Sequence, residues 1–104
     1  MHEAVEFIHK NGDALYEEGI KSDELGRLTD EAARIMRESG GMRLLQAKEF
    51  GGYESHPNDF LEWVMAVGFY APPAGWVAGV VGVHAHETSL MDPRVPEEVW
   101  GADP

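Results

Sequence analysis

Two histidines separated by one residue are the clearest candidates for chemistry in this sequence. His84 and His86 follow the apolar run 80–83. On a β-strand, side chains two residues apart share a face, so the pair could bind one metal ion. On an α-helix, the same positions lie about 200° apart and cannot share a ligand. The chemistry therefore depends on the secondary structure of this segment.

The strand interpretation predicts a zinc or iron site, which needs a third and usually a fourth ligand. The remaining histidines, His2, His9 and His56, lie in polar segments without ligand-like spacing, and the chain contains no cysteine. The amidohydrolase barrels in which H-x-H ends a metal-binding strand need about 250 residues, whereas this chain has 104. We therefore favour the helix and predict no metal site.

On a helix, His84 follows Val80 by four residues and Trp76 by eight, so it shares the face of the bulky apolar side chains. His86 falls on the face of Gly79 and Gly82, where another helix could approach closely. For His86 we favour the simpler interpretation, an ordinary histidine near a helix end.

The first half of the chain predicts two helices. Residues 3–16 place Ala4, Ile8 and Leu15 on one stripe, and residues 19–28 read as a polar connection. Thr29 is a good N-cap for a second helix, which a glycine pair ends at residues 40–41.

The second half predicts a different pattern. Residues 42–52 look irregular, and Pro57 opens a helix that is apolar on more than one side and should be buried by several neighbours. A second apolar helix starts at the paired prolines 72–73 and runs to about residue 91. Residues 96–100 form a short last helix, and residues 101–104 read as a linker. The predicted fold class is all-α, a small bundle of about four to five helices.

The uncharged stretch 63–85 is long enough for a transmembrane helix to be considered. Pro72 and Pro73 would break that span, and its flanks carry acids but no Lys or Arg to set topology. We therefore predict no membrane segment.

Composition narrows the function further. The formal net charge is -11, with 19 acidic against 8 basic side chains, so nucleic-acid binding is not expected. The absence of cysteine and of a targeting signal makes the cytoplasm the expected compartment.

From Trp76 to Met91, this second apolar helix is apolar around nearly its whole circumference, more than so small a domain can cover. We therefore expect another domain or a second subunit to cover it.

Five short motifs, in this order, resemble one known family. They are Leu44-Leu45-Gln46, Phe50-Gly51-Gly52, Gly75-Trp76-Val77, Gly82-Val83-His84 and Glu97-Glu98-Val99-Trp100-Gly101. Residues from about 25 to 104 are similar to the N-terminal helical domain of the acyl-CoA dehydrogenase superfamily, in its flavin-dependent monooxygenase branch of two-component phenol and secosteroid hydroxylases. Two departures are Ala47, where relatives often have proline, and the prolines 72–73, which replace a small-polar stretch.

The resemblance implies that residues 1–104 form a single helical domain, the N-terminal fragment of a three-domain enzyme that is inactive alone. It implies reduced flavin (FMN or FAD), bound mainly by domains absent from this chain and delivered by a flavin reductase component. It also implies O₂-dependent hydroxylation of a phenolic substrate and a homo-oligomer, a tetramer in the family.

The resemblance assigns site residues as well. His84 matches the histidine that faces the phenolic oxygen in some relatives and would be catalytic and substrate-binding. Trp76 would be a wall of the substrate pocket, with plain core packing as the alternative. Two other functions stay open: the N-terminal domain of an acyl-CoA dehydrogenase, and a non-catalytic helical interaction module.

Overall fold

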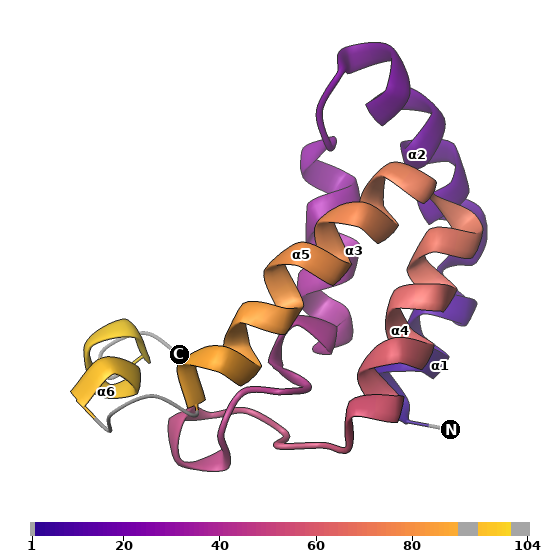
Figure 1. Ribbon diagram of the computed structural model, residues 1–104. Helices are drawn as coiled ribbons and strands as arrows, with labels where there is room; N and C mark the ends of the chain where they lie inside the picture. Colours follow the sequence, from indigo (N-terminus) through magenta and orange to yellow (C-terminus); the bar gives the residue numbers. More distant parts are fainter. Residues whose placement is uncertain (1, 90–93, 101–104) are drawn as a thin grey trace.

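The fold is a small helical bundle, seen in a computed structural model (Figure 1). It describes residues 2–89 and 94–100, with the backbone alone at residues 85–89, 96, 97 and 100. All the regular structure in these ranges is helical, which confirms the predicted all-α class. The helices are α1 (Glu3–Lys10), α2 (Gly12–Leu25), α3 (Asp30–Ser39), α4 (Pro57–Tyr70), α5 (Pro72–Ser89) and α6 (Arg94–Trp100), with 3-10 turns η1 (Gly41–Arg43) and η2 (Lys48–Phe50) between α3 and α4.

Local capping signals define both ends of α3 and the start of α4 as predicted. The Thr29 hydroxyl accepts a hydrogen bond from the backbone N–H of Ala32 at 3.1 Å, and Gly40 ends α3 with φ at 82°. Pro57 opens α4, where Nδ1 of His56 accepts from the N–H of Asn58 at 3.1 Å. These helix ends are therefore determined by residues within a turn of them.

The predicted helix over 3–16 and connection over 19–28 are wrong in their boundaries. The helix is interrupted at Asn11, which separates α1 from α2, and α2 then continues to residue 25. One side of α2 is buried at Gly19 and Ser22. A Cβ at Gly19 would lie 2.8 Å from the Cβ of Ala71, so the glycine lets α2 approach the α4–α5 turn. Burial of this narrow side stabilises a helix whose exposed sides carry both polar and apolar side chains.

The core lies where helices α1 to α5 and the turn η1 meet. Trp63 of α4 is fully buried at its centre, and Gly41 of η1 lies directly against the indole ring. The predicted stripe of α1 and α2 is confirmed, because Ala4, Ile8 and Leu15 are all fully buried in this core.

Helices α4 and α5 form a hairpin that turns at Ala71 (Figure 1). A Cβ at Gly75 would lie 2.6 Å from the Cα of Gly68, and one at Gly82 would lie 2.3 Å from Cε1 of Phe60. Of the glycine face of α5 that we expected to meet another helix, Gly82 therefore meets α4 of the same chain. This close approach sets the register of the two helices.

The start of α6 precedes the predicted one by two residues. The predicted end of α5 near residue 91 and the predicted linker 101–104 lie outside the described residues. Among the helices described, none has the length and apolar character to cross a membrane.

Candidate functional site

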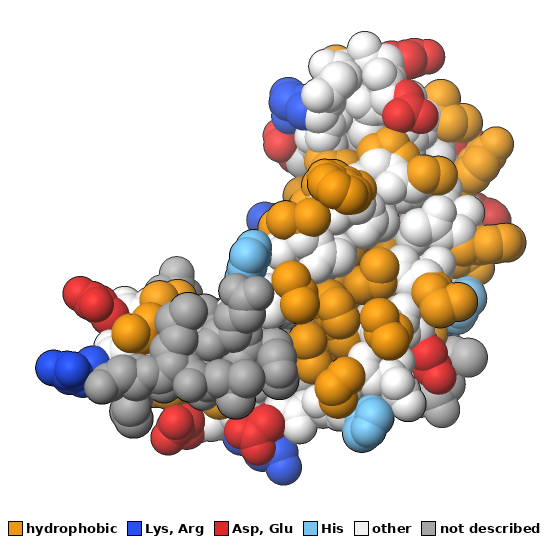
Figure 2. Space-filling view, in the orientation of Figure 1, with side chains coloured by type: hydrophobic (Ala, Val, Ile, Leu, Met, Phe, Trp, Pro, Cys, Tyr) orange, Lys and Arg blue, Asp and Glu red, His pale blue; other side chains and the backbone are white. Residues whose placement is uncertain are grey.

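The main candidate site is an apolar groove of about 540 Å³ between α4 and α5. It opens on a face where hydrophobic side chains gather over these two helices (Figure 2). None of its described lining residues is acidic, Lys or Arg, so the groove suits an uncharged, apolar molecule. The lining residues are Val64 from α4 and Gly75, Trp76, Gly79, Val80, Val83 and His84 from α5.

Both residues predicted for the site, Trp76 and His84, lie on this groove. They are eight residues apart on one face of α5, which corresponds to about 12 Å along the helix axis. The Trp76 side chain is 76% exposed, so core packing within the described chain does not explain it. The pair therefore brackets the groove, with an indole near one end and an imidazole near the other.

Position 86 also lies in α5, and its side chain is outside the described residues. A helix over residues 84 and 86 excludes the strand arrangement that a shared metal ion would need. Among the described residues, no three His, Asp or Glu side chains gather in a way that could hold a metal ion.

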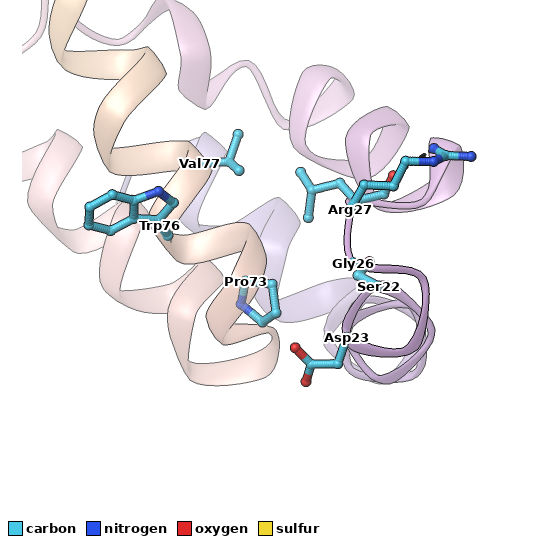
Figure 3. Close-up of a pocket in the computed structure, with 8 residues that line it drawn as sticks. Ser22, Asp23, Gly26, Arg27, Pro73, Trp76 and Val77 are labelled. Carbon is cyan, nitrogen blue, oxygen red and sulfur yellow. Dashed lines mark hydrogen bonds between the residues drawn. The ribbon is translucent and has the colours of Figure 1, made fainter.

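A second pocket, of about 460 Å³, lies on the opposite side of Trp76, between α2 and α5 (Figure 3). Ser22, Asp23 and Arg27 line it from the α2 side. The indole of Trp76 points away from these residues, and the Arg27 guanidinium points away from α5 (Figure 3). Arg27 donates to the carbonyl of Leu28 at 3.1 Å instead. This pocket therefore lacks the convergent polar groups that fix a ligand.

The α4–α5 groove is part of a larger exposed apolar surface. On α4, Leu61, Met65 and Phe69 are 55%, 72% and 78% exposed. The expectation that α4 is buried on several sides is therefore wrong for this stripe within the chain. On α5, Val80 and Val81 are 41% and 51% exposed, as expected for a helix that the domain cannot cover by itself. Such a contiguous apolar surface typically marks an interaction or ligand-binding face.

Ionisable groups with displaced pKa values lie away from the groove. The hydroxyl of Thr29 and then the ammonium of Lys21 lower the pKa of Glu18. Burial, followed by a hydrogen bond to Glu3, raises the pKa of Tyr53. The bonds that Arg34 makes to Glu31 keep the pKa of that carboxyl low. These groups stabilise helix ends and loops rather than build a reactive centre.

Comparison with known proteins gives relatives of one kind. The chain is 44% identical over 103 residues to the pigment production hydroxylase of Rhodococcus erythropolis, across 99% of this chain and 26% of that protein. It is 33% identical over 89 residues to the flavin-dependent monooxygenase oxygenase subunit HsaA of Rhodococcus jostii, across 86% of this chain and 23% of that protein. No protein-family profile matches the sequence.

The fold agrees with the sequence. The crystal structure of 3-HSA hydroxylase from Rhodococcus sp. RHA1 superposes with a TM-score of 0.93 at 30% identity, over 98% of this chain and 26% of that one. Over the residues that it spans, the chain is similar in sequence and fold to the flavin-dependent monooxygenase branch of the acyl-CoA dehydrogenase fold. The resemblance drawn from the five motifs is thereby confirmed. The chain spans about a quarter of the length of these monooxygenases.

Besides Trp76 and His84, five residues line the groove, and sequence reasoning assigned none of them to the site: Val64, Gly75, Gly79, Val80 and Val83. Val64 belongs to the helix predicted to be apolar on more than one side, but its place on the groove depends on how the hairpin packs. Gly79 was interpreted as a point of close helix approach, whereas it lies on the groove. The signal available for Gly79 was its position three residues after Trp76, on the same side of a helix.

Proposed function

We propose that this chain forms one wall of the aromatic-substrate pocket in a flavin-dependent phenol monooxygenase. The observation that carries the proposal is the joint placement of Trp76 and His84 on one apolar groove. The relatives named as a hydroxylase and as a monooxygenase oxygenase subunit support the reaction class. The name oxygenase subunit also supports a separate reductase as partner.

The groove fits a substrate ring better than it fits the flavin phosphate. Its described lining offers apolar side chains, an indole and an imidazole, but no Lys or Arg to neutralise a phosphate. In this proposal, reduced flavin, FMN or FAD, is held mainly by parts of a longer protein and supplies the chemistry of O₂ activation. Residues 1–104 then act as its helical domain.

His84 is the proposed catalytic residue, because its imidazole can hydrogen-bond to a phenolic oxygen. In water a phenol titrates near pH 10 and an imidazole near 6.5, so complete proton transfer costs about 5 kcal/mol. If the rest of a longer protein covers the groove and excludes water, a fixed hydrogen bond there reduces this cost and makes the ring more electron-rich for attack. Trp76 is the proposed wall against which the ring packs.

The test uses the full-length protein with reduced flavin, O₂ and a phenol, and measures the catechol formed. We expect His84→Ala to lower hydroxylation by about 100-fold while the reduced flavin is still oxidised. His84→Gln, which keeps a hydrogen-bonding group, should lose less. An equal loss of flavin oxidation and hydroxylation in His84→Ala would contradict the role of His84.

The same protein also tests the alternative activity. An acyl-CoA dehydrogenase would take electrons from an acyl-CoA thioester and would not need His84. Reduction of the bound flavin by acyl-CoA, without catechol from any phenol, would replace the proposed function by that one.

A further inference from the structure

Gly79 lacks a side chain although nothing in the described structure requires it to. A Cβ at this position would meet only Cγ1 of Val64, at 3.8 Å, which is an ordinary contact. Gly79 lies inside α5 and is not among the glycines with positive φ, so any residue could adopt its backbone conformation. Glycine is nevertheless one of the poorest helix formers. Neither packing nor backbone conformation therefore accounts for glycine here.

The neighbouring glycines of α5 behave differently. A Cβ at Gly75 would lie 2.6 Å from the backbone of Gly68, and one at Gly82 would lie 2.3 Å from the ring of Phe60. Both positions need glycine because α4 lies directly against them. Gly79 lies between these two contacts, at a point where the helices leave space and the groove opens.

We propose that Gly79 determines the size of the aromatic substrate, because the lack of a side chain there keeps the floor of the groove beside Val64 low. This inference rests on the proposed function and adds a specificity-determining residue to it. Any side chain at position 79 would project toward Val64 and occupy part of the groove that Trp76 and His84 bracket. A methyl group at this position would reach Val64 in ordinary van der Waals contact and would raise the floor of the groove beneath a bound ligand.

The groove also indicates which part of the substrate fills this space. Val64, Val80 and Val83 surround Gly79 with aliphatic groups, and the described lining carries no acid, Lys or Arg. A phenol with a bulky apolar substituent matches this lining, because its hydroxyl can reach His84 while the substituent is buried among the valines. A small phenol would leave the space beside Gly79 unfilled.

The test compares Gly79→Ala and Gly79→Val with wild type in the full-length enzyme. The substrates are phenol and a series of 4-alkylphenols of increasing size, with kcat/KM from catechol formation and Kd from calorimetry. We expect Gly79→Ala to lower kcat/KM for the largest alkylphenol by about 10- to 100-fold, and Gly79→Val by more. Unsubstituted phenol should change by about threefold or less.

Gly68→Ala is the matched control. It adds the same methyl group to the same helix pair, 3.8 Å from the Cα of Gly75, but at a residue that does not line the groove. This variant should keep the size preference of wild type. Because alanine favours helix, Gly79→Ala should melt at the wild-type temperature or above it.

The outcomes separate this inference from the proposed function. If catechols form but the substitutions at residue 79 change all phenols equally or not at all, the inference is overturned and the function stands. If the alkylphenols bind with a preference that Gly79→Ala shifts, yet no catechol forms, the size role stands and the function fails. Absence of phenol binding in wild type would overturn both. If the valine variant does not fold, the alanine variant alone decides.

Discussion

The indole of Trp63 and the hydroxyl of Ser39 form a buried hydrogen bond that joins α4 to the end of α3. The Nε1–H of Trp63 donates to Oγ of Ser39 at 3.0 Å. The same oxygen accepts from the backbone N–H of Gly41 at 3.1 Å and donates to the carbonyl of Met36 at 2.6 Å. One small hydroxyl therefore satisfies three polar groups in the core at once.

We expect Ser39→Ala to destabilise the protein more than the loss of one hydroxyl suggests. The substitution leaves the N–H groups of Trp63 and Gly41 without this acceptor in a buried site, at about 1–3 kcal/mol for each unsatisfied group. Urea denaturation, followed by circular dichroism, measures the loss. Ser55→Ala is the control, because its hydroxyl makes one long contact of 3.4 Å and should cost less than about 1 kcal/mol.

A double-mutant cycle tests the Trp63 bond itself. Trp63→Phe removes the donor, so Ser39→Ala should cost less in that background than in wild type. Strict additivity of the two free-energy changes would show that the pair is not coupled.

Gly41→Ala should be among the most damaging single substitutions in the chain. Its Cβ would lie 1.8 Å from Cε2 of the buried, rigid indole of Trp63, so the ring or the η1 turn must shift. Overpacking of this kind costs about 3 kcal/mol. Gly26→Ala separates this effect from backbone strain, since Gly26 has φ at 73° but no atom near its Cβ position. We expect about 1 kcal/mol there, measured by the same denaturation. Equal losses at the two sites would rule out the clash as the cause.

Glu18 should give the fold part of its sensitivity to acid. Its carboxylate accepts hydrogen bonds from Oγ1 of Thr29 at 2.8 Å and from Nζ of Lys21 at 3.0 Å, and these partners lower its pKa. A carboxyl with a lower pKa in the folded state stabilises the fold fully above its unfolded pKa, near 4.5, and loses that contribution as the pH falls through the folded value.

The measurement is the free energy of unfolding between about pH 6 and pH 3. Wild type should lose more stability over this range than Glu18→Gln, whose amide oxygen can still accept from Thr29 but does not titrate. Glu24→Gln, on an exposed side of the same helix, should follow wild type. Parallel curves for wild type and Glu18→Gln would contradict the role of Glu18.

The helix ends that were predicted correctly are determined by residues that lie next to them in the sequence. The ends of α3 and the start of α4 follow from Thr29, Gly40 and Pro57, each of which acts on its own turn. The extent of α2 was missed because its cause is distant: Gly19 is buried by Ala71, some fifty residues later. A helix that is buried on one narrow side and carries apolar side chains on its exposed sides as well has a weak periodic signal.

The candidate site shows the same division. Helical periodicity alone placed Trp76 and His84 on one face of α5, because residues four apart share a face and Val80 lies four residues from each of them. It could not place Val64 opposite them, since the register of α4 on α5 depends on the contact between Gly68 and Gly75. The roles of the two residues in chemistry stay predictions that the assays of His84 variants address.

The exposed stripe of α4 should prove dispensable for folding but not for association. Phe69 is 78% exposed, so Phe69→Gln removes a surface contact and should change the unfolding free energy of the 104-residue chain by about 0.5 kcal/mol or less. Self-association of the chain, measured by sedimentation velocity, should fall because less apolar surface is available to pair. Val67 lies two residues away and is fully buried. Val67→Gln should therefore lower the unfolding free energy by about 3 kcal/mol or more, because it buries an amide without a hydrogen-bond partner. If Phe69→Gln were as destabilising as Val67→Gln, the stripe would belong to the core of this chain, and no covering partner would be needed to explain it.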